Sequence, residues 1–172
     1  MEEQVILVDI NDSQIGEMGK LEVHQKGELH RAFSIFIFNA HGELLLQQRA
    51  LNKYHSGGLW TNTCCSHQRP GEGNLDAANR RLMEEMGMKA DLTEVFNFTY
   101  RAEFESGLIE HEFDHVFFGK SDLLPVINTD EVANYKYMKL DALKGDLILR
   151  PEHYTPWLKI CLDIVVDHLK TY

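Results

Sequence analysis

Residues 60–87 read WTNTCCSHQRPGEGNLDAANRRLMEEMG, and this stretch decides the fold. Its first part, Trp60–Ser66, predicts a buried strand or the rim of one. Asn74 is a suitable N-cap for a helix that runs to Met86, and Gly87 is the residue type that commonly ends helices. The stretch therefore predicts a strand, a loop and a helix that carry a thiol, an imidazole and a pair of carboxylates close together.

The predicted helix has two distinct faces. Its apolar residues recur at helical spacing, so we expect one face to pack into the core: Leu75, Ala78, Leu82 and Met86. Arg81 and Glu85 lie four residues apart and therefore share a different face.

Sequence on both sides of this stretch predicts further strands, at Val5–Val8, Phe33–Phe38, Leu44–Gln48, Glu94–Tyr100, Leu108–Phe118 and Tyr135–Met138. The second and third form a predicted hairpin because 39–42 supplies turn residues, and a loop is expected at 52–58. Thr155 and Pro156 begin a last helix. The apolar stripe of that helix contains Trp157, Ile160, Cys161, Ile164, Val165 and Leu169. Because hairpins dominate, these elements predict an α/β (α+β) fold, a mixed β-sheet sandwich with a central helix and a C-terminal helix, rather than a doubly wound parallel sheet.

Length and charge narrow the classes of function. A chain of 172 residues fits one domain, which we expect over 1–172. The net charge of −10 argues against nucleic acid as the main partner, because phosphate backbones need a basic face. No apolar run approaches the ~20 residues that cross a bilayer, so we expect no membrane partner. The N-terminus lacks a positively charged signal region, and three cysteines do not make a disulfide framework. We therefore expect a cytoplasmic protein, a monomer or a homodimer.

A strand-borne pair of carboxylates is the first candidate for metal chemistry. In a strand over 108–118, Glu110 and Glu112 project to one face and His111 to the other. Two such carboxylates repel unless a cation or a shared proton lies between them. A solvated strand face explains this segment alone about equally well. His24, His30 and His67 offer imidazoles, and with the carboxylates they would suit Zn²⁺, Mn²⁺ or Mg²⁺.

The two neighbouring cysteines differ in their expected roles. Cys65 shares a strand face with His67, whereas Cys64 faces the opposite side as a small hydrophobic residue. Cys65 is therefore the candidate reactive thiol. An unperturbed thiol has a pKa near about 8.5 and is mostly protonated at neutral pH, which suits a proton donor or acceptor.

Adjacent carboxylates on the central helix suggest a second cation site. Glu84 and Glu85 could bridge a hard cation to a diphosphate, although such pairs often only face solvent. The phosphate oxygens would then need positive partners, and four residues are candidates: Lys20, Arg49, Lys53 and Arg81. Taken singly, each of these residues is better explained as a surface charge.

Taken together, the chain resembles the type I isopentenyl-diphosphate isomerases of the Nudix superfamily over residues 5–160. The resemblance rests on four segments in order, namely RALNK (49–53), WTNTCCSH (60–67), YRA (100–102) and EHE (110–112). It implies interconversion of isopentenyl and dimethylallyl diphosphate by a 1,3-proton shift.

The resemblance also assigns roles. It implies that a first divalent metal, Mn²⁺, Zn²⁺ or Mg²⁺, is bound by His24, His30, His67, Glu110 and Glu112, and that Glu85 binds a Mg²⁺ that arrives with the diphosphate. Cys65 and Glu112 would be the acid/base pair, supported by Tyr100. Lys20, Arg49, Lys53 and Arg81 would hold the isoprenoid diphosphate, and Trp157 would line its hydrocarbon pocket.

Departures from the Nudix hydrolase pattern help to distinguish an isomerase from a pyrophosphohydrolase. The first glycine of the hydrolase box is Ser66 here, and Arg81 replaces a glutamate that would gather Mg²⁺. The alternative is a Nudix pyrophosphohydrolase that acts on a nucleoside or other small diphosphate, with Glu72, Glu84 and Glu85 as its metal ligands. A non-enzymatic metal-binding domain would leave the thiol of Cys65 without a role. The sequence leaves open the first metal, the resting protonation state of Cys65, the order of proton transfers, and whether this or a related diphosphate is the physiological substrate.

Overall fold

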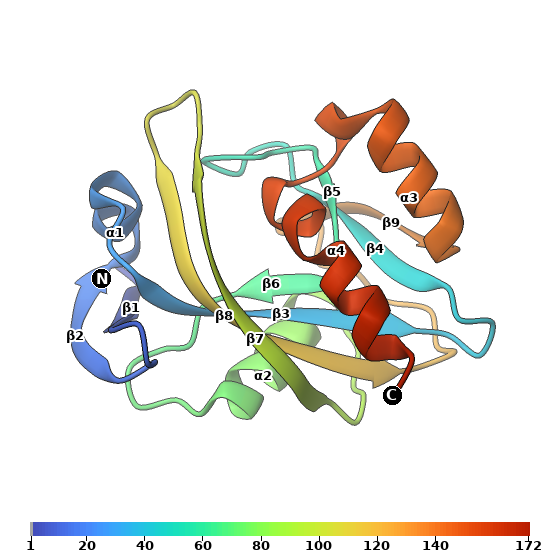
Figure 1. The fold of residues 1–172 in the computed structure, drawn as a ribbon, viewed down its shortest axis with the longest axis horizontal. Helices are drawn as coiled ribbons and strands as arrows, with labels where there is room; N and C mark the ends of the chain where they lie inside the picture. Colours follow the sequence, from blue (N-terminus) through green and yellow to red (C-terminus); the bar gives the residue numbers. More distant parts are fainter. Residues whose placement is uncertain (1) are drawn as a thin grey trace.

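The computed structural model describes residues 2–172 and is built on one branched sheet (Figure 1). Its strands are β1 (Gln4–Val8), β2 (Gln14–Gly19), β3 (His30–Phe38), β4 (Leu44–Arg49), β5 (Trp60–Thr61), β6 (Cys64–Ser66), β7 (Thr93–Glu103), β8 (Ile109–Lys120) and β9 (Val132–Met138). The order β2-β1-β3-β4-β5 forms the main path, while β6 and β8 also pair with β3, β7 with β8 and β9 with β4. Only β3 and β8 run parallel among the pairs between the described strands. The predicted mixed sheet is confirmed.

Helices cover both faces of the sheet. They are α1 (Lys20–Lys26), α2 (Asn74–Met86), α3 (Leu140–Leu149) and α4 (Pro156–Leu169), with a short 3₁₀ turn η1 (Pro151–His153). In Figure 1, α2 lies behind the sheet and α4 in front of it. Strand β3 shows why: Phe33, Ile35 and Ile37 pack toward α2, whereas Phe36 and Phe38 pack toward α4. Because successive side chains of a strand point to opposite faces, this one apolar strand contributes side chains to two hydrophobic cores.

The central helix begins and ends close to where the sequence predicts. The N-cap is Gly73, one residue before the expected Asn74, whose side chain instead accepts a hydrogen bond from Gln68. Gly87 ends the helix in the left-handed conformation, at φ 60°. A Cβ there would lie 2.5 Å from the carbonyl oxygen of Val126, so only glycine fits.

One predicted core position of α2 is wrong. Leu75 is 47% exposed, whereas Ala78, Leu82 and Met86 are fully buried, as expected. Ala77 takes the fourth core position.

Helix α4 also differs from its prediction in details of its cap and its buried face. Thr155 is the N-cap, as predicted, but its hydroxyl donates to Thr61 and accepts no hydrogen bond from the helix backbone. Ile160 is 44% exposed, while Leu158 and Leu162, which the predicted stripe omits, are buried.

The predicted strand at 60–66 is two short strands. Thr61 pairs with β4, and residues 64–66 pair with β3. Between them the Asn62 amide donates to the carbonyls of Ile35 and Cys64, which breaks the ladder and turns the chain. The 33–38 and 44–48 hairpin is confirmed, with the Asn39 side chain accepting from the backbone N–H groups of His41 and Glu43.

The register around β8 determines what meets at the site. His30 lies opposite Glu112 in the parallel β3–β8 ladder, and Tyr100 lies opposite Glu112 in the antiparallel β7–β8 ladder. One carboxylate is therefore flanked by an imidazole and a phenol on the α4 face. In residues 2–172 we find no helix long and apolar enough to cross a membrane.

Candidate functional site

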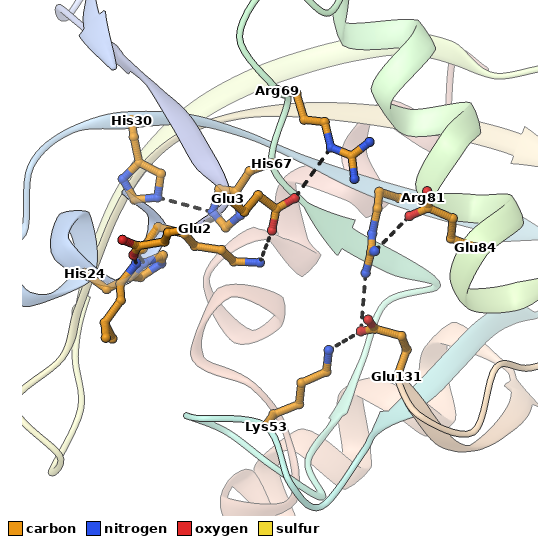
Figure 2. A network of polar contacts seen from close by, with 12 residues as sticks. Glu2, Glu3, His24, His30, Lys53, His67, Arg69, Arg81, Glu84 and Glu131 are labelled. Carbon is orange, nitrogen blue, oxygen red and sulfur yellow. Dashed lines mark hydrogen bonds and ion pairs between the residues drawn. The ribbon is translucent and has the colours of Figure 1, made fainter. Parts of the chain in front are cut away.

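Three imidazoles converge on Glu112. His24 comes from α1, His30 from β3 and His67 from the end of β6, and all are buried. Oε1 of Glu112 lies 3.0 Å from Nε2 of His67, 3.4 Å from Nε2 of His30 and 3.9 Å from Nε2 of His24. The two nitrogens of His30 and His67 are only 3.2 Å apart (Figure 2). These four ligand atoms all lie within 4.8 Å of one another, as a metal site requires.

Hydrogen bonds to backbone carbonyls determine which imidazole nitrogens are unprotonated and face the interior of the site. Nδ1 of His24 lies 2.6 Å from the carbonyl of Lys20, and Nδ1 of His30 lies 2.9 Å from the carbonyl of Glu28. A carbonyl only accepts, so both Nδ1 atoms carry the proton and both Nε2 atoms are bare. Nε2 of His24 is buried without a hydrogen-bond partner among residues 2–172. Converging bare lone pairs beside a carboxylate fit a divalent cation, and an Nδ1–H group that donates to a backbone carbonyl is typical of metal-bound histidine.

Burial keeps His24 and His67 neutral. It lowers the pKa of His67 to about 3, although Glu112 acts in the opposite direction. It also lowers the pKa of His24, and the neighbouring His30 adds to this effect. Neutral imidazole is the form that binds metals.

Tyr100 bridges the two strand-borne carboxyl groups. Its hydroxyl lies 2.6 Å from Glu112 and 2.9 Å from Glu110. Burial and the charge of Glu112 raise the pKa of Glu110 well above its usual value. Burial acts the same way on Glu112, but the close contacts of its carboxylate with the His30 and His67 rings outweigh burial and hold that pKa well below its usual value. The pKa values of these two carboxyl groups are therefore shifted in opposite directions, and Glu112, the more acidic of the two, accepts a hydrogen bond from Tyr100.

The two cysteines face opposite sides of β6, as predicted. Sγ of Cys64 lies 3.4 Å from Glu85 on the α2 side. Sγ of Cys65 donates to Oδ1 of Asn62 at 3.0 Å and accepts from Nε1 of Trp157 at 3.1 Å. Burial, reinforced by the nearby Asp114, raises the pKa of Cys65 to about 12. The thiol of Cys65 is therefore protonated at neutral pH.

The four predicted phosphate-binding cations line the same cavity as Cys65, and carboxylates hold three of them. Lys20 lies 3.2 Å from Glu3. Figure 2 shows Glu131 between Lys53 and Arg81, and Arg69 beside Glu3. Arg81 also pairs with Glu85, whose other oxygen accepts from Gln47.

Arg49 is the fourth predicted phosphate-binding cation of this cavity. Its guanidinium lies over the Trp157 ring, 5.3 Å from the centroid, and donates to the carbonyl of His55. The cavity thus collects every predicted site residue except His24 and His30, which lie directly behind Glu112: Lys20, Arg49, Lys53, Cys65, His67, Arg81, Glu85, Tyr100, Glu110, Glu112 and Trp157.

Sequence reasoning missed several polar residues of this cavity, among them His55 and Glu131. His55 lies 3.2 Å from Glu110, and Glu131 pairs with Lys53 and Arg81. Neither shows a periodic pattern, since both are in loops beside β strands. The only available signal for His55 was its position two residues after Lys53 in the RALNK segment.

The fold has known counterparts. A NUDIX domain model matches residues 28–158. A MutT protein from Methanosarcina mazei superposes with a TM-score of 0.68 at 18% identity, over 83% of this chain and 96% of its own. An Ap4A hydrolase from C. elegans superposes with a TM-score of 0.60 at 20% identity, over 83% of this chain and 98% of its own. The architecture is therefore that of a Nudix domain.

Sequence relatives place the chain more narrowly. Isopentenyl-diphosphate Delta-isomerase 2 of Aromatoleum aromaticum is 58% identical over 97% of this chain and 88% of its own. Isopentenyl-diphosphate Delta-isomerase of Pectobacterium atrosepticum is 51% identical over 98% of this chain and 94% of its own. The chain belongs to the isopentenyl-diphosphate Delta-isomerases of the Nudix family.

Proposed function

We propose that this protein interconverts isopentenyl and dimethylallyl diphosphate by a metal-dependent 1,3-proton transfer. The observation that carries the proposal is the shared cavity of Cys65 and the Tyr100–Glu112 pair, with cationic side chains around it. Similarity to the isomerases supports the reaction, and the geometry supports the residues.

The metal assignment follows from the donor set. His24, His30, His67, Glu110 and Glu112 would hold the first divalent cation, with Mn²⁺, Zn²⁺ and Mg²⁺ as candidates. Bound there, the cation would neutralise the facing carboxylates and hold Glu112 in one orientation. Glu85 would bind a Mg²⁺ that arrives with the diphosphate.

The reaction needs one proton gained and one lost. The terminal methylene carbon takes a proton, the π electron pair forms that C–H bond, and C2 then loses a proton to give the new double bond. Cys65 and Glu112 are the two groups positioned for these transfers. The raised pKa of Cys65 keeps its thiol protonated, and the lowered pKa of Glu112 favours its carboxylate form, so the cavity would contain one donor and one acceptor. The face of the double bond that the substrate turns toward each group decides which of the two groups protonates the methylene carbon and which deprotonates C2.

The intermediate requires protection from water. Protonation of the double bond gives a tertiary cation that water would quench, so the hydrocarbon must lie in a dry pocket. Trp157 is 3% exposed and its indole N–H contacts Cys65 directly. An aromatic face can stabilise a desolvated cation by about 2 kcal/mol.

The diphosphate would replace carboxylates at the cavity mouth. Lys20, Arg49, Lys53 and Arg81 would bind it, and the oxygens of Glu3 and Glu131 now occupy positions on three of these cations. Acidic residues that a hydrolase would use for Mg²⁺ are neutralised here: Glu72 lies 2.7 Å from Arg80, and Glu84 lies 2.9 Å from Arg81.

The test is product analysis with the metal-stripped and metal-restored protein. Proton NMR of isopentenyl diphosphate incubated with Mg²⁺, Mn²⁺ or Zn²⁺ should show dimethylallyl diphosphate, with activity lost on chelation. Release of phosphate or pyrophosphate instead would indicate the hydrolase.

Two variants separate the roles of the acid/base pair. Cys65→Ala should abolish turnover and leave fold and metal content unchanged. Glu112→Gln should lose both turnover and first-site metal. A Cys65→Ala protein that fails to fold, or a Glu112→Gln protein that keeps both properties, would contradict these roles.

The cellular setting is also part of the proposal. Cys64, Cys65 and Cys161 are all free thiols in the described chain. Together with the acidic composition, this suits the reducing cytoplasm, where the small isoprenoid diphosphate would be the partner.

A further inference from the structure

Asn62 is a fully buried amide that contacts the proposed catalytic thiol, and the proton transfer described above does not use it. It lies between β5 and β6. Its oxygen, Oδ1, accepts a hydrogen bond from Sγ of Cys65 at 3.0 Å. Asn62 does not line the cavity that holds the thiol, so any effect it has on the substrate must pass through the cysteine.

Two backbone carbonyls determine which end of this amide faces the sulfur. Nδ2 of Asn62 lies 3.1 Å from the carbonyl oxygen of Ile35 and 3.0 Å from that of Cys64. Carbonyl oxygens only accept, so the NH₂ group must lie on their side and Oδ1 on the side of Cys65. A flipped amide would leave these buried carbonyls facing an oxygen, without their donors. The amide therefore presents an acceptor, and only an acceptor, to the thiol.

Cys65 has a second partner of the opposite kind. The indole N–H of Trp157 only donates, and it lies 3.1 Å from Sγ. The sulfur therefore accepts from the indole and donates to the amide. These two hydrogen bonds together fix both the position of the sulfur and the direction of its S–H bond. Of the two partners, only Asn62 receives the thiol proton.

A chain of buried hydroxyl groups continues from Asn62 to α4. The Thr61 hydroxyl donates to Oδ1 of Asn62 at 2.8 Å, and the Thr155 hydroxyl donates to that of Thr61, also at 2.8 Å. Both threonines are buried. Thr155 is the N-cap of the helix that carries Trp157. The chain thus connects the two hydrogen-bond partners of Cys65 to each other across two elements.

We propose that Asn62 is a positioning residue for the proton transfer, and that it holds the S–H bond of Cys65 in place until the double bond arrives. The inference rests on the proposed function and deepens it, because it assigns the resting partner of the thiol proton. In the direction in which Cys65 donates, the S–H bond breaks and its electron pair stays on the sulfur. The proton joins the methylene carbon, whose π electrons form the new C–H bond. Asn62 itself neither gains nor loses a proton.

A purely structural role is the competing explanation, because the NH₂ group of Asn62 also holds the turn between β5 and β6. Thr61→Val separates the two roles. It removes one donor from Oδ1 and leaves both bonds from the amide to the backbone carbonyls in place. Two donors that share one oxygen weaken each other, so Oδ1 becomes a stronger acceptor for Cys65 when Thr61 no longer donates.

The S–H stretching vibration gives the direct test. Infrared spectra of each metal-loaded protein, taken as a difference against the same protein with Cys65→Ala, isolate the band of Cys65 from those of the other thiols. A hydrogen-bonded S–H group absorbs at lower frequency than a free one. Asn62→Ala should therefore move the band to higher frequency, and Thr61→Val should move it to lower frequency. An unmoved band in either variant would overturn the proposal.

Asn79→Ala is the matched control. That asparagine is exposed on α2, outside the cavity, and its side chain donates to the carbonyl of Leu75. The S–H band of Cys65 should be the same in this variant as in the wild type. A shift as large as that in Asn62→Ala would mean that the band reports general loosening of the fold, which would overturn the proposal.

Turnover provides an independent readout. Asn62→Ala should lower kcat by about a hundredfold, the order of the loss when a catalytic group is misplaced by about 1 Å. The KM for isopentenyl diphosphate should stay nearly unchanged, because Asn62 does not line the cavity in which the substrate would bind. A full kcat, or a loss confined to KM, would contradict the positioning role.

Failure of the inference and failure of the proposed function give different results. A wild type that shows both band shifts but does not isomerise isopentenyl diphosphate would support the hydrogen bond and contradict the proposed function. An active isomerase whose Asn62→Ala variant keeps its band and its kcat would do the reverse. If Asn62→Ala does not fold, the band of Thr61→Val decides.

Discussion

At the scale of single residues, alternation along strands correctly predicted which side chains share a face. It separated Cys65 from Cys64 and placed Glu110 and Glu112 on one face, and the structure shows both. His55 and Glu131 could not be found in this way, because loop residues have no period to place them. Their roles depend on contacts with segments far away in sequence, such as Phe104 and Arg81.

The raised pKa of Cys65 predicts an unusual alkylation profile. Thiolate is the reactive form, so the rate rises with pH until the pKa is reached. The folded protein should show a rate that still rises through pH 10, because burial brings this pKa to about 12. Thiols of the unfolded chain should level off just above about pH 8.5. The measurement is the difference in alkylation between wild type and Cys65→Ala, and a plateau near pH 8.5 in the folded protein would contradict it.

Glu131 should compete with the diphosphate. Its carboxylate pairs with Lys53 and Arg81, so Glu131→Gln should free both for phosphate oxygens. We expect pyrophosphate to bind about two- to fivefold more tightly by calorimetry, the factor expected for a partly exposed ion pair. Glu22→Gln is the control, since Glu22 pairs with Lys26 outside the cavity. Weaker binding in Glu131→Gln would mean that the carboxylate instead orients the cations.

At the scale of elements, long periodic segments were predictable and short ones were not. The expected strands and the helices α2 and α4 are present, with ends shifted by a few residues. Helix α1, with seven residues, and strand β2, with six, escaped prediction. Both are too short for a clear period, and α1 is held by its neighbours: the Lys20 N–H donates to Glu3, and Gly27 ends the helix at φ 70°. Helix α3 was missed because only Leu143 of its apolar residues is buried.

Two leucines of α2 test the revised core. Leu82 is fully buried and Leu75 is 47% exposed, although both fit the same helical period. Leu82→Ala should lower the free energy of unfolding by about 2–5 kcal/mol, through lost burial and a cavity. Leu75→Ala should change it by no more than about 0.5 kcal/mol. Urea unfolding of the two variants measures both values, and similar losses would place Leu75 in the core after all.

At the scale of the whole molecule, the parallel β3–β8 pairing could not be read from the sequence. It joins strands about eighty residues apart, from His30↔Glu112 to Phe38↔Lys120. Local patterns do not encode such pairing, yet it brings His30 to Glu112 and positions the site. The hairpins predicted locally set the fold class, and this one long-range ladder assembles the chemistry.

The metal-free protein should lose stability in acid. His55 and His67 have folded pKa values of about 3, below the unfolded value of about 6.5. As pH falls below 6.5, the unfolded chain binds these protons and the folded chain does not. Each group should therefore lower the free energy of unfolding by up to about 1.4 kcal/mol per pH unit until pH 3 is approached. Urea unfolding of chelated protein from pH 7 to 4.5 measures this, as one cooperative transition if residues 1–172 form a single domain. His67→Gln should reduce the slope, and an unchanged slope would contradict the assignment.

Proton transfer between two separate groups in one cavity is the central step of the proposed reaction. Turnover of isopentenyl diphosphate in D₂O, followed by proton NMR, tests this directly. Because the donor exchanges with solvent between turnovers, dimethylallyl diphosphate should carry deuterium in a methyl group, and Cys65→Ala should form no product. Dimethylallyl diphosphate without deuterium, or full turnover by Cys65→Ala, would contradict the account.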